Sequence, residues 1–301
     1  MTEQDRFRGC LLGLAVGDAV GTTLEFKPRG SFKPITDMVG GGPFKLKPGE
    51  WTDDTSMALC LATSLVETGA LNPKDQMDRY SRWNDDGYLS SNGRCFDIGN
   101  TVASALNRYL KTRDPIAGST DPQSAGNGSI MRLAPVPMFY FPDREAAVQF
   151  SAESSRTTHG APECVDACRF FGGVIFSALA GRSKEEILFS QADSFRGEPK
   201  IVAIARGEYR HKPDSEIRGT GYVVQSLEAA LWCFFNSKTF QQAILKAANL
   251  GDDADTTAAI CGQVAGAFYG ASGIPEHWLN QLVMRQEISD LADRLYVGTM
   301  P

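Results

Sequence analysis

The sequence contains little histidine and has no excess of basic residues. It has 3 His in 301 residues, and its 30 Lys and Arg are outnumbered by 36 Asp and Glu, which gives a formal net charge of −6. A protein that binds nucleic acid over a wide surface needs a basic face. The charge balance therefore argues against a broad nucleic-acid surface and leaves room only for a local basic pocket.

Zinc-binding cysteine motifs and long apolar runs are also missing. The 7 cysteines follow no zinc or redox spacing, so we expect reduced, buried thiols. The longest strongly apolar run, residues 170–181, falls short of the roughly 18 residues that span a membrane. The apolar residues 10–17 lack an A-x-A cleavage site. We expect a cytoplasmic protein without membrane contact and, as the simplest state, a monomer.

Strand-like alternation is rare, whereas apolar residues recur with helical spacing along the whole chain. Phe7, Leu11, Leu14 and Ala15 form one such stripe, and similar stripes occur within 162–181, 223–234 and 240–250. No Pro-rich, Ser-rich or low-complexity linker divides the sequence. The pattern predicts an all-α fold with a single compact domain over residues 1–301.

Two acidic segments far apart in the sequence resemble each other. Trp51-Thr52-Asp53-Asp54-Thr55 and the segment 251–257 (Gly-Asp-Asp-Ala-Asp-Thr-Thr) each precede an apolar stretch of helical period, which predicts that both lie at helix N-termini. One explanation is helix capping, because Asp and Thr there accept hydrogen bonds from free backbone N–H groups.

The number of carboxylates points to a second explanation. A cap needs one carboxylate, and these two segments carry five. If the two helix starts face each other, they form a dense set of oxygen ligands, whose mutual repulsion a cation would relieve. Hard divalent cations prefer such a set, whereas zinc or copper would call for His or Cys. We therefore predict a site for one or two Mg2+ or Mn2+ ions.

The loops carry further candidate residues. The segment 21–49 is rich in Gly and Pro and contains Glu25, so it fits a lid over a pocket as well as a plain surface loop. Asp97 and Asn100 precede another predicted helix, where Asp97 is either a cap or a functional carboxylate.

Glycines in residues 125–132 (Ala-Gly-Asn-Gly-Ser-Ile-Met-Arg) allow backbone N–H groups to approach a phosphate, although Gly-Asn-Gly-Ser is also a common turn. His159 lies just before a helix predicted to start at Pro162, and a lone His is more often structural. Tyr222 also opens a helix, where it would either stack on a planar ligand or fill the core.

Seven of these segments occur together in the order seen in the ADP-ribosylglycohydrolase family. The chain resembles the bacterial branch of that family, typified by dinitrogenase reductase-activating glycohydrolase. The matching segments are 8–19, 51–55, 96–101, 125–132, 158–159, 221–223 and 251–257. Each is short, but seven in the same order are highly specific.

The resemblance implies a compact orthogonal bundle of helices with a centre of two divalent cations, Mg2+ or Mn2+, at the base of an ADP-ribose cleft. The metal ligands it implies are Thr52, Asp53, Asp54, Asp253, Asp255 and Thr256. The implied catalytic residues are Asp97 and Glu25. The implied substrate-binding residues are Asn100, Gly126, Asn127, Gly128, Ser129, Ile130, Met131, His159 and Tyr222.

The expected activity is therefore hydrolysis of a mono-ADP-ribosylated protein with release of ADP-ribose. The segment 96–100 resembles the branch that cleaves the bond to arginine, and a carboxylate at Asp97 suits a planar guanidinium. A serine- or nucleic-acid-linked ADP-ribose hydrolase is the main alternative. A metal-dependent phosphohydrolase and a non-catalytic ADP-ribose-binding protein are weaker ones.

Overall fold

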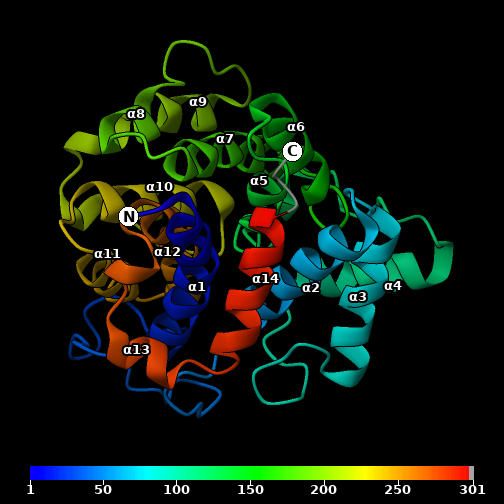
Figure 1. The fold of residues 1–301 in the computed structure, drawn as a ribbon, viewed down its shortest axis with the longest axis horizontal. Helices are drawn as coiled ribbons and strands as arrows, with labels where there is room; N and C mark the ends of the chain where they lie inside the picture. Colours follow the sequence, from blue (N-terminus) through cyan, green and yellow to red (C-terminus); the bar gives the residue numbers. More distant parts are fainter. Residues whose placement is uncertain (298–301) are drawn as a thin grey trace.

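The computed structural model describes residues 1–297, and within that range regular structure is helical. Short 3₁₀ helices and a few isolated bridges accompany the α-helices, and these residues form no β-strand. The all-α fold predicted from the apolar periodicity is confirmed. Figure 1 shows α1, α12 and α14 at the centre, α3 and α4 to one side and α7 to α9 along another.

Local sequence signals mark the starts of several helices. The helices are α1 (Glu3–Gly21), α2 (Asp53–Thr68), α3 (Pro73–Asp86), α4 (Asn100–Thr112), α5 (Pro135–Phe139), α6 (Arg144–Ser155), α7 (Pro162–Leu179), α8 (Lys184–Phe189), α9 (Pro199–Ala205), α10 (Val223–Phe235), α11 (Phe240–Ala248), α12 (Ala254–Tyr269), α13 (Glu276–Gln281) and α14 (Arg285–Val297). Proline opens α3, α7 and α9, where its missing N–H costs nothing.

The central feature of the fold is an unusually close contact between α1 and α12. A Cβ atom added to Gly13 would lie 2.3 Å from the carbonyl oxygen of Gly262, and one added to Gly9 would lie 2.2 Å from that of Gly266. Real Cβ atoms do not approach so closely. The two backbones therefore touch, and only glycine fits at the contact.

The direction of this contact decides which helix ends meet. Gly9 faces Gly266 near the end of α12, whereas a Cβ added to Gly21 would lie 2.4 Å from the carbonyl oxygen of Ala254 at its start. The two helices are thus antiparallel. The C-terminal end of α1 lies beside the N-terminal end of α12 and its acidic residues.

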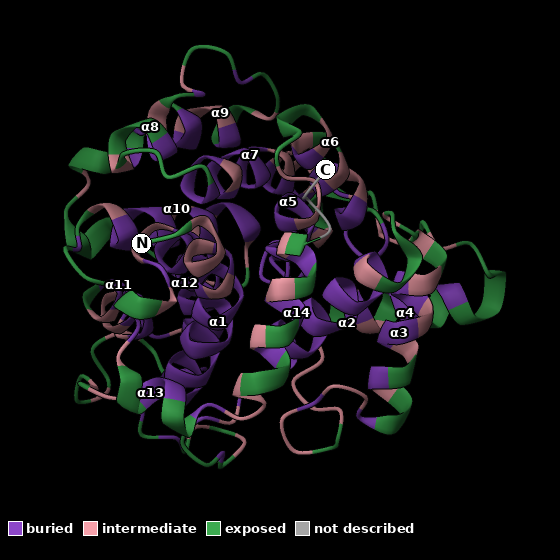
Figure 2. Ribbon diagram, in the orientation of Figure 1, coloured by how far each residue is buried: buried purple, intermediate pink, exposed green. Residues whose placement is uncertain are grey.

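The apolar stripe in residues 7–15 suggested a helix with one buried face, but α1 is buried on nearly all sides from Gly9 to Gly21. Neighbouring helices enclose it, as the purple ribbon in Figure 2 shows. Its one carboxylate beyond the first turns, Asp18, is fully buried with the apolar residues.

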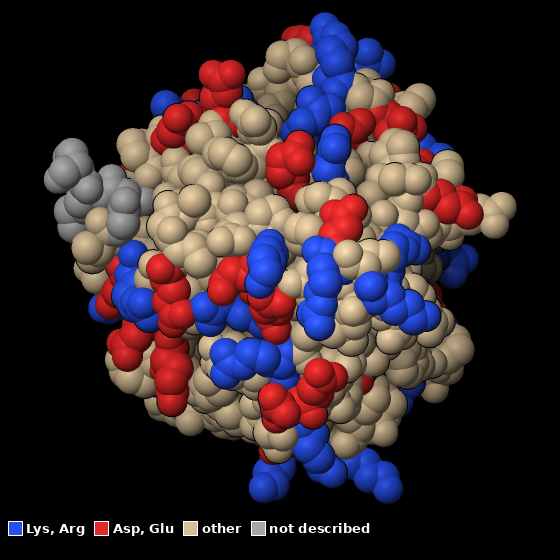
Figure 3. Space-filling model, turned by 90° about the vertical axis from the view of Figure 1, so that its right-hand side faces the viewer, with Lys and Arg blue, Asp and Glu red and all other residues tan. Residues whose placement is uncertain are grey.

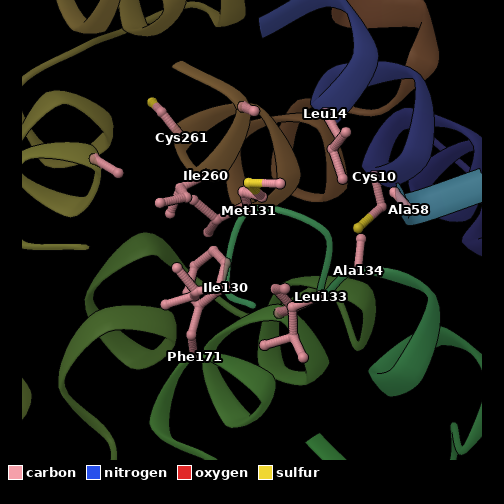
Figure 4. Packing of buried hydrophobic residues seen from close by; sticks show 14 of the residues in the cluster. Cys10, Leu14, Ala58, Ile130, Met131, Leu133, Ala134, Phe171, Ile260 and Cys261 are labelled. Atoms are coloured by element: carbon pink, nitrogen blue, oxygen red, sulfur yellow. The ribbon is translucent and has the colours of Figure 1, made fainter. Parts of the chain in front are cut away.

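The loop before α5 is anchored in the same core. Ile130 and Leu133 are fully buried, and Met131 is nearly so. Figure 4 shows these side chains between α12 and α7, with Ile260 and Phe171 among their neighbours. This anchoring fixes the glycine-rich turn that precedes Ile130.

Neither the described helices nor the face drawn in Figure 3 shows a membrane span or a large basic area. None of the helices within residues 1–297 is both long enough and apolar enough to cross a bilayer. On the face drawn in Figure 3, Lys and Arg side chains are interspersed with Asp and Glu side chains.

The α1–α12 contact can be tested by Gly13→Ala. Alanine is the better helix former by about 1 kcal/mol, so an uncrowded site would gain stability. The clash with Gly262 should instead lower the free energy of unfolding by about 1–3 kcal/mol in urea titration. Gly99→Ala is the control, because nothing lies within 4 Å of a Cβ there. A Gly13→Ala protein as stable as the wild type would contradict the close contact.

Candidate active site

Carboxylates from distant parts of the sequence meet at the junction of α1, α2 and α12. Asp53 and Asp54 begin α2, and Asp253 and Asp255 lie at the start of α12, so both acidic segments occupy helix N-termini as predicted. Glu25 follows the 3₁₀ helix Thr22–Leu24 that extends α1. The arrangement follows directly from the antiparallel contact of α1 with α12.

Asp18 of α1 caps α2 from outside that helix. One carboxylate oxygen accepts hydrogen bonds from the backbone N–H and hydroxyl of Thr52, at 2.9 Å each, and the other accepts from the N–H (3.0 Å) and hydroxyl (2.6 Å) of Thr55. Thr52, the N-cap residue of α2, makes no side-chain capping bond. Asp18 therefore caps α2, a role that the sequence had suggested for the acidic segment 51–55 itself.

Asp18 accepts the hydrogen bond that an N-cap side chain would otherwise accept from Thr55, so the carboxylates of Asp53 and Asp54 are free for another role. The N-cap residue of α12, Asp253, also makes no side-chain capping bond. In the second segment, Oδ1 of Asp255 accepts a hydrogen bond from the N–H of Thr256 at 2.9 Å. Capping by the N-cap side chain thus explains neither acidic segment. The positive ends of both helix dipoles still favour negative charge at this place.

The acidic side chains form two groups that share one member. Carboxylate oxygens of Asp18, Asp54 and Asp255 lie within 4.8 Å of one another, and so do those of Glu25, Asp97 and Asp255. Asp255 thus belongs to both groups. Each group is compact enough to hold one cation.

Hydroxyl groups complete the first of these groups. The Thr52 hydroxyl lies 3.3 Å from Oδ2 of Asp54, and the Thr256 hydroxyl lies 3.4 Å from the same atom. The structure therefore brings together Thr52, Asp54, Asp255 and Thr256, which the resemblance implied as metal ligands. Asp53 and Asp253 line the same cavity as Asp255 and Thr256.

Isolated carboxylates would be unfavourable here. Burial, followed by repulsion from neighbouring carboxylates, raises the pKa of Asp53, Asp54 and Asp255. Burial and the charge of Asp97 raise the pKa of Glu25 to about 9. Burial and the charge of Asp18 raise the pKa of Asp97 to about 7.

The residues present fit bound cations. Within residues 1–297, no Lys, Arg or His forms an ion pair with any of these carboxylates. Oδ1 of Asp54 and Oε2 of Glu25 are buried without a hydrogen-bond partner among the described residues. Buried charge without a counter-charge is costly, and an oxygen-only donor set suits Mg2+ or Mn2+.

The carboxylates lie at the base of a cavity of about 480 Å³. Its wall is built from several loops and from the starts of α2, α4 and α12. The lining includes Glu25, Phe26, Asp53, Asp97, Ile98, Gly99, Asn100, Thr101, Val102, Gly126, Asn127, Gly128, Met131, His159, Gly221, Asp253, Asp255 and Thr256.

Asp97 does not cap α4. Gly99 is the N-cap residue of that helix, and Asp97 has a left-handed backbone with φ of 62°. This conformation is uncommon for a residue other than Gly, although Asp tolerates it better than most. In this conformation the Asp97 carboxylate lies close to the carboxylates of Glu25 and Asp255, and it makes no capping hydrogen bond to α4. Asn100, the first residue of α4, lines the same cavity.

The glycine-rich turn at 126–131 offers fewer N–H groups than its sequence suggests. Four of its amides already donate to protein carbonyl oxygens, namely those of Gly126, Asn127, Ile130 and Met131. Among the described residues, the amides of Gly128 and Ser129 have no acceptor. An anion at this turn would therefore be bound by these two N–H groups.

His159 and Arg132 contact this turn and fix its conformation. Arg132 is buried and donates to the carbonyl oxygen of Gly128 at 2.7 Å and to the hydroxyl of Thr158 at 2.7 Å. Burial and the Arg132 charge lower the pKa of His159 to about 3, so its ring is neutral at pH 7. A Cβ atom on Gly128 would lie 2.8 Å from that ring, which explains the glycine.

Three predicted substrate-binding side chains do not reach this cavity. The Ser129 hydroxyl accepts a hydrogen bond from Ser155 at 2.8 Å in the interior, and Ile130 lies in the apolar core (Figure 4). Tyr222 lies in a neighbouring cavity of about 760 Å³, where its hydroxyl donates to Glu163 at 2.5 Å. Asn127 lines the first cavity, but its side-chain amide donates to Asp253 at 2.8 Å.

Sequence reasoning assigned no role to Asp18. The signal was present, because Asp18 is the one charged residue in the otherwise apolar segment 9–21. A carboxylate in a helix buried on all sides needs partners. That α1 is buried on all sides became evident only from the structure.

Comparison with known proteins agrees with this geometry. A model of the ADP-ribosylglycohydrolase family matches residues 1–300. The chain is 48% identical to the ADP-ribosylarginine hydrolase Tri1 of Serratia proteamaculans over 97% of this chain and 79% of that protein. It is 32% identical to the ADP-ribosyl-[dinitrogen reductase] glycohydrolase of Rhodospirillum rubrum, over 94% of this chain and 92% of that protein.

A solved structure described as an ADP-ribosylglycohydrolase-related protein complex superposes with a TM-score of 0.88 and 42% identity, covering 99% of both chains. A family match over nearly the whole chain, together with relatives of this similarity, establishes the relationship. The protein belongs to the ADP-ribosylglycohydrolase family.

Proposed function

We propose that this protein is a metal-dependent hydrolase that removes mono-ADP-ribose from arginine side chains of a modified protein. The observation that carries the proposal is the sharing of Asp255 between two groups of buried carboxylates at the base of the cavity. The named relatives support the choice of linkage, since the Serratia proteamaculans protein is an ADP-ribosylarginine hydrolase.

The residues that would hold two divalent cations are Thr52, Asp53, Asp54, Asp253, Asp255 and Thr256. Asp18 would fix the Thr52 end of this set through its four hydrogen bonds. When bound, such cations would neutralise the carboxylates, polarise ribose hydroxyl groups and acidify a coordinated water.

The remaining residues would place the substrate over this centre. The free amides of Gly128 and Ser129 suit the diphosphate, because backbone N–H groups in a turn bind anions without a charged side chain. The neutral His159 ring lies against the same turn. The second cavity, with Tyr222, would receive the part of ADP-ribose beyond the diphosphate.

Asp97 and Glu25 would act at the glycosidic bond. Breaking the bond between ribose C1 and the guanidinium nitrogen builds positive charge on C1, which a nearby carboxylate stabilises. Asp97 would also pair with the planar guanidinium through two hydrogen bonds and orient it for departure. The guanidinium leaves as neutral guanidine, and the attacking water gives up a proton to a carboxylate of this pair.

The linkage is tested with matched peptides that carry ADP-ribose on arginine or on serine, in the presence of Mg2+ or Mn2+. We expect a higher kcat/KM for the arginine peptide, because a seryl oxygen offers no charge for Asp97 to bind. Mass spectrometry should identify intact ADP-ribose and unmodified arginine as products. Preference for serine would overturn the assigned linkage, and release of AMP or phosphate would overturn the glycohydrolase assignment.

Asp97→Asn tests the role of that carboxylate. The amide keeps the shape but cannot accept a proton, so kcat should fall by about 100-fold or more while calorimetric affinity for ADP-ribose is retained. Asp193→Asn, at an exposed position, is the control and should behave as the wild type. Turnover of Asp97→Asn close to that of the wild type would exclude a catalytic carboxylate at this position.

A further inference from the structure

An exposed phenylalanine stands at the entrance of the carboxylate cavity. Phe26 lines the cavity next to Glu25 and is 66% exposed, although most large apolar side chains of the chain are buried. An aromatic ring left in water beside a functional cavity is available for a ligand.

The backbone of Phe26 has a strained conformation. Its φ is 60°, a left-handed value that is unfavourable for a bulky residue. Two hydrogen bonds fix the conformation: the Phe26 N–H donates to the carbonyl oxygen of Asp252 at 2.7 Å, and the Asp252 N–H donates to that of Lys27 at 2.8 Å. The segment that carries Phe26 is thereby tied to the start of α12.

Two more rings support Phe26 from the side. Phe44 meets Phe26 edge to face, with ring centroids 6.4 Å apart, and Phe96 lies 5.2 Å from Phe44. Phe96 precedes Asp97 in the sequence, just as Phe26 follows Glu25. Each of these two rings thus adjoins a carboxylate of the group Glu25, Asp97 and Asp255. We call Phe26, Phe44 and Phe96 the aromatic wall.

We infer that Phe26, supported by the other two rings of the aromatic wall, binds the guanidinium of the arginine side chain to which ADP-ribose is attached. This inference rests on the proposed function and names the residue that would select the leaving group. Arginine stacks on aromatic faces while its N–H groups pair with carboxylates, and this part of the cavity offers both.

The hydrogen-bonding groups beside the wall favour this occupant over the other parts of the substrate. Glu25 and Asp97 offer carboxylate oxygens, which accept hydrogen bonds from a guanidinium, whereas a diphosphate presents only further acceptors to them. The amides that suit the diphosphate belong to Gly128, which lines the cavity, and to Ser129, which follows it in the sequence. Adenine offers a carboxylate only the two hydrogens of its N6 amino group, whereas a guanidinium offers paired N–H donors and a positive charge and also stacks on the ring.

The experiment measures KM and kcat on an ADP-ribosyl-arginine peptide for the wild type and for Phe26→Ala, Phe26→Leu and Phe26→Tyr. Because Phe26 is exposed, each variant should fold, which equal melting temperatures would verify. Phe26→Ala should raise KM by about 5- to 30-fold with little change in kcat or in the Kd for ADP-ribose. Phe26→Tyr should match the wild type, and Phe26→Leu should recover only part of the loss.

Leu110→Ala, which truncates another exposed apolar side chain on α4, is the matched control and should leave KM unchanged. An unchanged KM in Phe26→Ala would overturn the inference. A rise in KM matched by weaker ADP-ribose binding would also overturn it, since the wall would then serve ADP-ribose. A KM for Phe26→Leu equal to that of the wild type would exclude a role for the aromatic ring. If the wild type does not cleave the arginine linkage, the proposed function fails before any variant is compared.

Discussion

The backbone contact between α1 and α12 determines where the functional groups of this protein lie. Glycines at 9 and 13 on α1 and at 262 and 266 on α12 let the two helices touch in antiparallel orientation. The end of α1 is thereby placed against the start of α12. Asp18 then reaches the start of α2, and Glu25 reaches Asp255. A wider spacing between the two helices would move these carboxylates apart.

This arrangement concentrates negative charge where the protein supplies no counter-charge. Desolvation and mutual repulsion both oppose ionisation of Asp53, Asp54 and Asp255, and the pKa of each is raised accordingly. The helix dipoles offset part of this cost, whereas the hydrogen bonds to Asp18 stabilise only Asp18, whose charge adds to the repulsion on Asp53 and Asp54. Divalent cations would offset the rest, so the same charge density that is unfavourable in the isolated protein prepares the site for metal.

Much of the fold and part of the site follow from the sequence. Apolar periodicity predicts helices because each helix buries a stripe, and the acidic segments are found at the helix N-termini where their patterns placed them. Local patterns carry no information on which helices meet. The full burial of α1, and with it the role of Asp18, depends on the α1–α12 contact and was missed. The turn at 126–131 shows a similar limit, since its glycines indicate a turn but not which amides the fold has already used.

The most direct test of this account is titration of metal-free protein with Mn2+, followed by calorimetry and electron paramagnetic resonance. Asp255 belongs to both carboxylate groups, so the wild type should bind two Mn2+ ions per chain and Asp255→Asn should lose both. Asp193→Asn should bind as the wild type does, and circular dichroism should show that all three proteins are folded. Undiminished Mn2+ binding by folded Asp255→Asn, or no binding by the wild type, would contradict a metal centre built around Asp255.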